Sequence, residues 1–148
     1  MKTISRLRGS LCAAAFAATF FAVSLLASEE GARSEANDII YGLANQFGLS
    51  VRPIYWKGFL RPGQSDYVTY TLYSGNTYIL VAGGCESARD VDLLVYDENW
   101  NFITRDNDVD KRAAVLIRPR WTGTFHVKVT MYSADQGGAH WVLMAAYQ

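Results

Sequence analysis

Eight short β-favouring runs, separated by turn residues, follow position 53 and constrain the fold more than any other feature. Each run holds four to nine residues, and pairs such as Pro62-Gly63 and Gly83-Gly84 stand between them. The runs cover residues 55–60, 66–73, 77–82, 91–96, 102–105, 113–118, 124–132 and 140–147. Strands of this length and spacing predict an all-β, two-sheet antiparallel β-sandwich of jelly-roll-like connectivity.

Alternation within two of the runs predicts which side chains face the core. Apolar residues occupy every second position of 124–132, and the run 66–73 has the same phase. The positions expected to point inward are Phe125, Val127, Val129 and Met131 in one run and Val68, Tyr70 and Leu72 in the other.

A single helix is predicted ahead of the strands. Residues 29–37 are polar, and we expect them to fray, whereas an apolar stripe begins soon after Ser34, the candidate N-cap, and ends before Gly48. The stripe consists of Ala36, Ile39, Ile40, Leu43 and Phe47. Because an isolated helix this short is marginal, we expect it to cover an open end of the sandwich rather than to dock a partner.

The N-terminus has the pattern of a secretion signal. Three basic residues precede an apolar stretch of 17 residues, 11–27, whereas spanning a bilayer takes about 20. We therefore expect residues 1–27 to be removed on export to the periplasm or the exterior. What remains is a polar segment with a short helix, 28–53, and a sandwich domain, 54–148.

Removal of the signal changes both the cysteine count and the charge. Only Cys85 remains, which excludes an internal disulfide and leaves a buried thiol or one that pairs between chains. The signal carries three of the 14 basic residues and no acid, so 11 basic residues face 14 acidic ones in the mature chain. This balance does not predict binding to nucleic acid or to an anionic membrane.

Several segments together resemble the bacterial pre-peptidase C-terminal (PPC) domain family. They are Gly58-Phe59-Leu60, 63–67, the Ser74-Gly75 turn, 90–97 and 122–125. The resemblance covers about residues 55–147 and implies a jelly-roll-like accessory module, with calcium or matrix binding in some members. No catalytic domain precedes the module, so the resemblance implies a free-standing secreted one.

Five aspartates form the candidate metal site. Asp90 and Asp92 share one face of a strand, and Asp106, Asp108 and Asp110 follow at alternate positions after the next run. If a hairpin brings them together, these hard oxygen ligands suit calcium, although the spacing is not that of an EF-hand. The alternative is a solvated acidic loop that blunts strand edges.

Aromatic residues supply the candidate ligand-binding surface. Trp100 lies at an expected hairpin tip, and Tyr67 and Tyr73 belong to the outward phase of their run. Exposed rings there could stack on sugars or anchor a protein, whereas core packing is the alternative for most aromatic residues.

No catalytic constellation is apparent. The only histidines are His126 and His140, and no Gly-x-Ser-x-Gly motif or zinc-ligand spacing occurs. We therefore expect a non-catalytic binding or accessory module for an extracytoplasmic protein, matrix or glycan ligand, with calcium as the one candidate cofactor. The alternatives are a structural envelope or periplasmic protein and, more weakly, a hydrolase with an unrecognised site.

Overall fold

The computed structural model describes residues 28–135 and 137–148, which form one helix and nine strands. The elements are α2 (Glu29–Phe47), β1 (Ser50–Val51), β2 (Trp56–Leu60), β3 (Ser65–Leu72), β4 (Tyr78–Gly84), β5 (Ala88–Tyr96), β6 (Phe102–Asp106), β7 (Arg112–Ile117), β8 (Gly123–Ala134) and β9 (Ala139–Tyr147). The eight predicted runs correspond to β2–β9. The predicted secretion signal, 1–27, lies outside the described residues.

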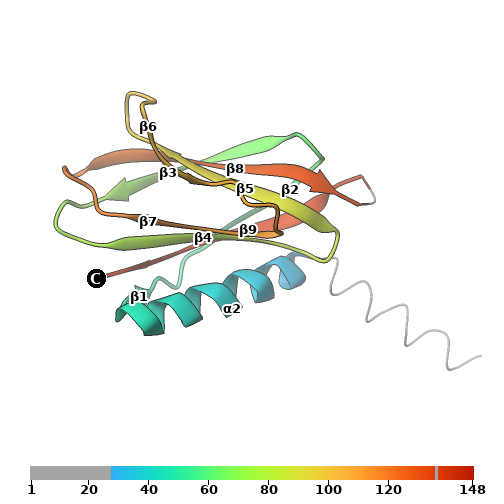
Figure 1. The fold of residues 1–148 in the computed structure, drawn as a ribbon, viewed down its shortest axis with the longest axis horizontal. Helices are drawn as coiled ribbons and strands as arrows, with labels where there is room; N and C mark the ends of the chain where they lie inside the picture. The colour runs from blue at the N-terminus through green and yellow to red at the C-terminus, as the bar shows by residue number, and fades with distance from the viewer. Residues whose placement is uncertain (1–27, 136) are drawn as a thin grey trace, which may run out of the picture.

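The strands form two antiparallel sheets stacked face to face (Figure 1). In the five-stranded sheet, β9 pairs with β4 on one side and with β1 and β2 on the other, and β7 follows β4 at the edge. The four-stranded sheet has the order β3-β8-β5-β6. Consecutive strands from β2 to β7 alternate between the sheets except for the β5–β6 hairpin, which is the connectivity of a jelly roll. The predicted β-sandwich is confirmed.

The core between the sheets uses the predicted phases. All seven side chains expected to point inward from β8 and β3 are buried, and Trp141 and Leu80 of the facing sheet are about 1% exposed. Cys85 is also fully buried.

The helix lies along the outer face of the five-stranded sheet, so that the molecule has three layers (Figure 1). Every residue of β4 is buried, and so are seven of the nine residues of β9. Both strands are buried because the second sheet covers one of their faces and the helix covers the other. The expectation that the helix covers an open end of the sandwich is therefore wrong, since it covers a face. No helix in the described part of the chain has the length and hydropathy needed to cross a membrane.

The helix starts earlier than the sequence pattern suggested. It begins at Glu29, after Ser28, so the predicted fraying of 29–37 and the N-cap at Ser34 are wrong. Its C-terminal end is as predicted, with Gly48 in the left-handed region at φ 68°. The buried side is made of small residues and one large one, Ile40, whereas Phe47 of the predicted stripe is 44% exposed. The small residues are Gly31, Ala32, Ala36 and Ala44.

The small residues allow a close approach between helix and sheet. A Cβ atom on Gly83 of β4 would lie 2.5 Å from the backbone nitrogen of Ala36 and 2.8 Å from the backbone oxygen of Ala32. Glycine at this position therefore sets the spacing between the two layers.

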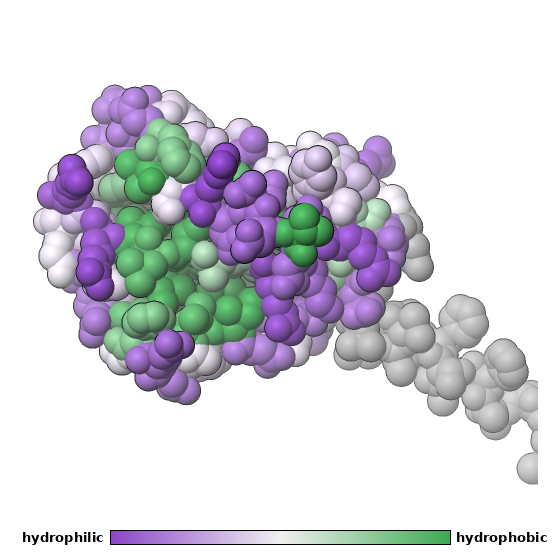
Figure 2. Space-filling view, in the orientation of Figure 1, coloured by the Kyte–Doolittle hydropathy of each residue, from purple (hydrophilic) through white to green (hydrophobic). Residues whose placement is uncertain are grey.

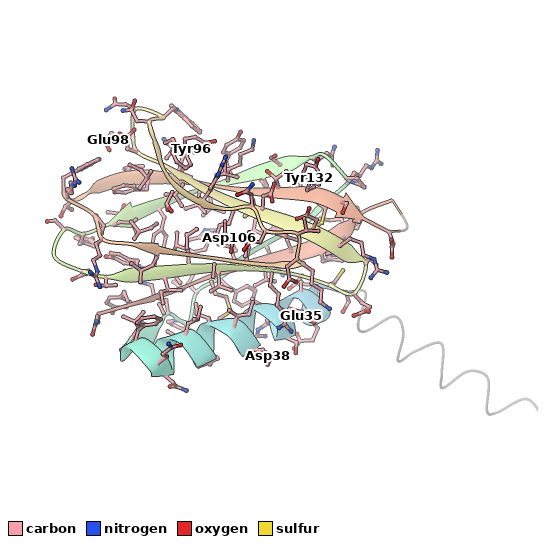
Figure 3. All side chains as sticks on the ribbon, viewed as in Figure 1. Glu35, Asp38, Tyr96, Glu98, Asp106 and Tyr132 are labelled. Carbon is pink, nitrogen blue, oxygen red and sulfur yellow. The ribbon has the colours of Figure 1, made fainter. Side chains whose placement is uncertain are left out.

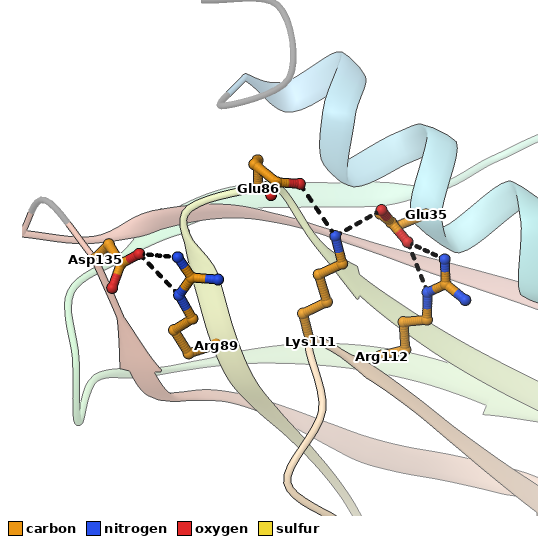
Figure 4. Close-up of polar contacts among 6 residues, drawn as sticks. All are labelled: Glu35, Glu86, Arg89, Lys111, Arg112 and Asp135. Atoms are coloured by element: carbon orange, nitrogen blue, oxygen red, sulfur yellow. Dashed lines mark hydrogen bonds and ion pairs between the residues drawn. The ribbon is translucent and has the colours of Figure 1, made fainter. Parts of the chain in front are cut away.

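Ion pairs also tie the helix to the sheet (Figure 4). The Glu35 carboxylate lies 2.8 Å from Lys111 Nζ and accepts a 2.6 Å hydrogen bond from Arg112 Nε. Lys111 also pairs with Glu86, at 3.3 Å. Burial alone would raise the pKa of Glu35, but its hydrogen bonds and charge interactions with Lys111 and Arg112 outweigh burial and lower that pKa.

Candidate functional site

The hairpin between β5 and β6 is organised by the side chain of Asp97, which is 5% exposed. Its Oδ1 atom accepts hydrogen bonds from the backbone N–H groups of Asn99 and Asn101, at 2.9 and 2.8 Å. Its Oδ2 atom accepts a third from the Asn101 side chain at 2.9 Å. The side-chain hydrogen bond from Asn101 lowers the pKa of Asp97, with smaller contributions from the two backbone bonds and from His126. The tip of the hairpin is thus held in one conformation.

Trp100 occupies that tip in an unusual backbone conformation. Its φ of 63° is the one positive φ among non-glycine residues of the described chain. Its N–H donates to the Asp97 carbonyl at 3.0 Å, which closes the turn. Positive φ is uncommon for a bulky residue and costs free energy, so the hairpin retains Trp100 against a local preference.

The strained turn places the indole of Trp100 flat on the outer face of the four-stranded sheet. The indole stacks on the imidazole of His126 in β8, with centroids 4.0 Å apart and planes 4° from parallel. Tyr67 of β3 meets it edge-on at 5.5 Å, and Tyr96 of β5 contacts it at 5.9 Å. We call Trp100, His126, Tyr67 and Tyr96 the aromatic platform.

Strand register explains why these side chains meet. His126 of β8 stands opposite Tyr96 of the neighbouring strand β5. On its other side, β8 pairs with β3, where Thr69 stands opposite His126 and Tyr67 stands opposite Lys128. All point away from the core because they share the outward phase. The platform is open to solvent, since Trp100 is 54% and Tyr67 50% exposed, and Lys128 Nζ lies 5.9 Å from the Tyr67 ring centroid.

Two of the three predicted ligand-binding residues are therefore together, and the third is apart. Tyr73 is 51% exposed, but it follows the end of β3 six positions beyond Tyr67, about 20 Å along an extended chain. Tyr96 marks the platform end of the sheet in Figure 3, whereas Tyr132 lies towards the opposite end. His126 and Tyr96 were not predicted as part of this surface, although the outward phase of both strands was a signal for them.

The acidic residues lie at the other end of β5. Asp90, beside two register shifts, is 5% exposed, and its buried Oδ1 atom has no hydrogen-bond partner in the described structure. Burial raises the pKa of Asp90, and the charge of Asp110 adds to the effect. Burial likewise raises the pKa of Asp92. The negative charges of Asp90 and Asp106 raise it further, and the positive charges of Lys128 and Arg105 lower it in part.

The candidate calcium ligands do not converge. Asp106 is engaged by two backbone groups, since its Oδ2 atom accepts from Ala114 N–H at 2.9 Å and its Oδ1 atom from Asp108 N–H at 3.1 Å. Within residues 28–135 and 137–148, no three histidine, cysteine or acidic side chains are grouped as metal ligands would be. Asp92 interacts electrostatically with Asp90 and Asp106, and Asp90 with Asp110, whereas calcium binding stays a prediction.

Each of the two histidines contacts an aromatic ring. His126 lies under Trp100, and His140 meets Phe59 edge-on, with centroids 5.2 Å apart. In the described part of the chain neither imidazole hydrogen-bonds an acid or a hydroxyl group, as a general base would in many hydrolases.

The fold and the exposed ring cluster thus define a jelly-roll domain with an aromatic surface site. No protein-family model matches the sequence, and no curated protein matches it. Among solved structures, the chain is similar to PliG of Aeromonas hydrophila, a periplasmic lysozyme inhibitor of g-type lysozyme, at 17% identity and a TM-score of 0.47. The match covers 64% of this chain and 85% of that one.

Two further structures show similar likeness. The pre-peptidase C-terminal domain of a collagenase from Bacillus anthracis shares 20% identity at a TM-score of 0.48, over 62% of this chain and 87% of that one. A de novo designed double-stranded β-helix shares 11% identity at a TM-score of 0.36, over 62% and 97%. A PPC domain is therefore among the similar structures, whereas no family assignment is made from the sequence.

Proposed function

We propose that this chain is an exported, non-catalytic binding module whose ligand-binding surface is the aromatic platform. The observation that carries the proposal is the strained backbone conformation of Trp100 together with the exposure of its indole. A left-handed conformation costs about 1–3 kcal/mol at a non-glycine residue, yet the hairpin keeps it and leaves the indole 54% exposed. Backbone strain of this kind clusters at active sites and ligand-binding sites, which supports a binding role for the indole.

The geometry favours a glycan as the ligand. The indole is flat and backed by His126, and Tyr67 stands nearly perpendicular to it at 79°. The C–H groups of a sugar ring are attracted to the electron-rich face of an aromatic ring, and an upright neighbour limits sliding. Lys128 beside Tyr67 supplies a donor for sugar hydroxyl groups.

Co-sedimentation with insoluble cellulose, chitin and peptidoglycan tests the proposal. We expect the mature chain to be retained by at least one polysaccharide and Trp100→Gly to lose retention. Glycine suits φ 63°, so relief of backbone strain should offset part of the lost ring contacts, and a thermal melt checks that this variant stays folded. The matched control is Tyr132→Ala, which removes a 66% exposed ring from β8 outside the platform and should leave retention unchanged.

Two outcomes would contradict this function. Equal retention of Trp100→Gly and the parent chain would show that the platform is not the binding surface. Absence of retention by every polysaccharide would favour a protein ligand or a purely structural envelope role. A hydrolase is the weakest alternative, because neither His126 nor His140 has a hydrogen-bonded acid or hydroxyl partner in the described structure.

Calcium at the acidic end of β5 is a second, separable proposal. It is favoured by the unpartnered Oδ1 atom of Asp90 and by the charge of Asp110 beside it, since a cation would relieve both. Binding should raise the melting temperature in excess calcium, and a chelator should reverse the shift. Asp90→Asn and Asp110→Asn should abolish the rise, and Asp38→Asn on the exposed side of α2 should not. An unchanged midpoint in calcium would exclude the site.

A further inference from the structure

A cavity of about 340 Å³ lies beside the β6 edge of the sandwich, and Trp100 is not among its lining residues. Phe102 and Ile103 of β6 form one wall, and Trp121 and Phe125, which follow β7, form another. Figure 2 shows that apolar surface gathers on this face of the molecule and is bordered by hydrophilic side chains. The volume is at the lower end of the range for small-molecule sites, which suits one short apolar group.

The aromatic wall is fixed in place by several contacts. Trp121 Nε1 donates to Glu98 Oε2 at 3.0 Å, and the indole packs on Phe125 at 5.7 Å with planes 24° apart. The backbone just after it is anchored by Thr122, whose Oγ1 atom accepts a 3.0 Å hydrogen bond from Ser74 N–H. The cavity is therefore built before any ligand arrives, which lowers the entropic cost of binding.

Two guanidinium groups line the same cavity and have no partner. Arg118 and Arg120 are both exposed, and the buried Pro119 separates them. Neither makes a hydrogen bond or ion pair with any described residue. Glu98, which belongs to the β5–β6 hairpin, is engaged by Trp121. Unpaired arginines at an apolar cavity form a site for an anion, because guanidinium groups bind carboxylates through two parallel hydrogen bonds.

We propose that this cavity binds a small amphipathic carboxylate, with its apolar body against Phe102, Trp121 and Phe125 and its carboxylate on Arg118 and Arg120. The chemistry is shared by medium-chain acyl acids and by aryl acids. A glycan does not fit it, because the walls are apolar and the polar groups are both cationic. Phe102 contacts Tyr96 of the aromatic platform, with centroids 6.3 Å apart, but no platform residue lines the cavity. The two sites are therefore tested with different probes and variants.

Titration of the ¹⁵N-labelled mature chain tests the proposal, with the Trp121 indole N–H signal as the local reporter. Octanoate represents the medium-chain acyl acids and 2-naphthoate the aryl acids. Octan-1-ol, which has the chain length of octanoate but no charge, is the neutral control. We expect at least one carboxylate to shift Trp121 with a dissociation constant below about 1 mM. Octan-1-ol should bind at least about tenfold more weakly than octanoate if the acyl acid is the ligand.

Three variants make the result specific. Arg118→Gln with Arg120→Gln should weaken the carboxylate at least about tenfold and bring it to the level of a neutral probe. Ile103→Asp places a negative charge in the cavity wall, where it would repel the carboxylate and weaken binding. The control is Arg61→Gln, which removes an exposed arginine outside the cavity and should not weaken binding. The inference is overturned if neither carboxylate shifts the Trp121 signal at concentrations below those at which the carboxylate forms micelles. It is also overturned if the double arginine variant binds the carboxylate as tightly as the parent chain does.

Discussion

The indole of Trp100 lies on the imidazole of His126 with their ring planes only 4° from parallel. The indole comes from a hairpin tip and the imidazole from the fourth residue of β8, so the contact depends on the tip being folded down onto the sheet. The stack therefore couples the geometry of the hairpin to the outer surface of the sandwich.

Replacing the lower ring tests this coupling. His126→Ala should leave Trp100 unsupported and weaken glycan binding roughly two- to tenfold, the amount expected for one aromatic pair. His126→Phe keeps a flat ring beneath the indole and should retain most of the affinity. Both variants are compared by affinity for the retained polysaccharide and by melting temperature. Equal binding by His126→Ala would show that the stack does not support the site.

Replacing Gly83 by alanine tests the spacing between helix and sheet, and the same replacement at Gly42, which has no close neighbour, is the control. Gly83→Ala should reduce the free energy of unfolding by about 1–3 kcal/mol, because its Cβ atom would press the backbone of α2 away from β4. Gly42→Ala in the same helix meets nothing within 4 Å and should stabilise by about 0.5–1 kcal/mol. Denaturant unfolding of both variants gives the comparison, and destabilisation by Gly42→Ala would contradict the description of the helix.

Glu35 should make the fold sensitive to acid. Its pKa is lower in the folded than in the unfolded chain, so its contribution is complete above the unfolded value and is lost as the pH falls through the folded value. Glu35→Gln should therefore cost about 1 kcal/mol at pH 7, discounted for partial exposure of Arg112, and almost nothing at low pH. Thermal melts across pH check this, and a cost that does not change with pH would refute it.

Asp90 should have the opposite effect. Burial raises its pKa above that of the unfolded chain, so its ionisation destabilises the fold. The penalty is absent below the unfolded pKa and grows to its full size as the pH rises through the folded value. Asp90→Asn should therefore raise the melting temperature at pH 7 in the presence of chelator, with a gain that vanishes in acid, whereas Asp38→Asn should not. Destabilisation by Asp90→Asn at neutral pH would show that the carboxylate has a favourable role.

The strands were predictable because their signals are local. Alternation in 124–132 located the core face of β8, and the apolar run 77–82 located β4. The start of α2 was not predictable from polarity, because Ala32 and Ala36 gain their role only through contact with Gly83 of a distant strand. The two-residue β1 is likewise defined only by its pairing with β9.

The site shows the same division. Exposure of Trp100 and Tyr67 followed from a turn and a strand phase, which are local features. Their contact with His126 and Tyr96 depends on the register of three strands and on a positive φ at Trp100, neither of which the sequence states. The burial of Asp90 similarly follows from register shifts in β5, which pull it out of simple alternation.

Glycan binding by the aromatic platform is tested most sharply by the response of the Trp100 indole N–H signal to soluble glycans. The labelled mature chain is titrated with cellotetraose and chitotetraose, and the indole signals of Trp56, Trp121 and Trp141 serve as internal references. We expect a saturable shift of Trp100 with at least one oligosaccharide while the references stay in place. Binding that leaves Trp100 unmoved, or no response to either oligosaccharide, would contradict it.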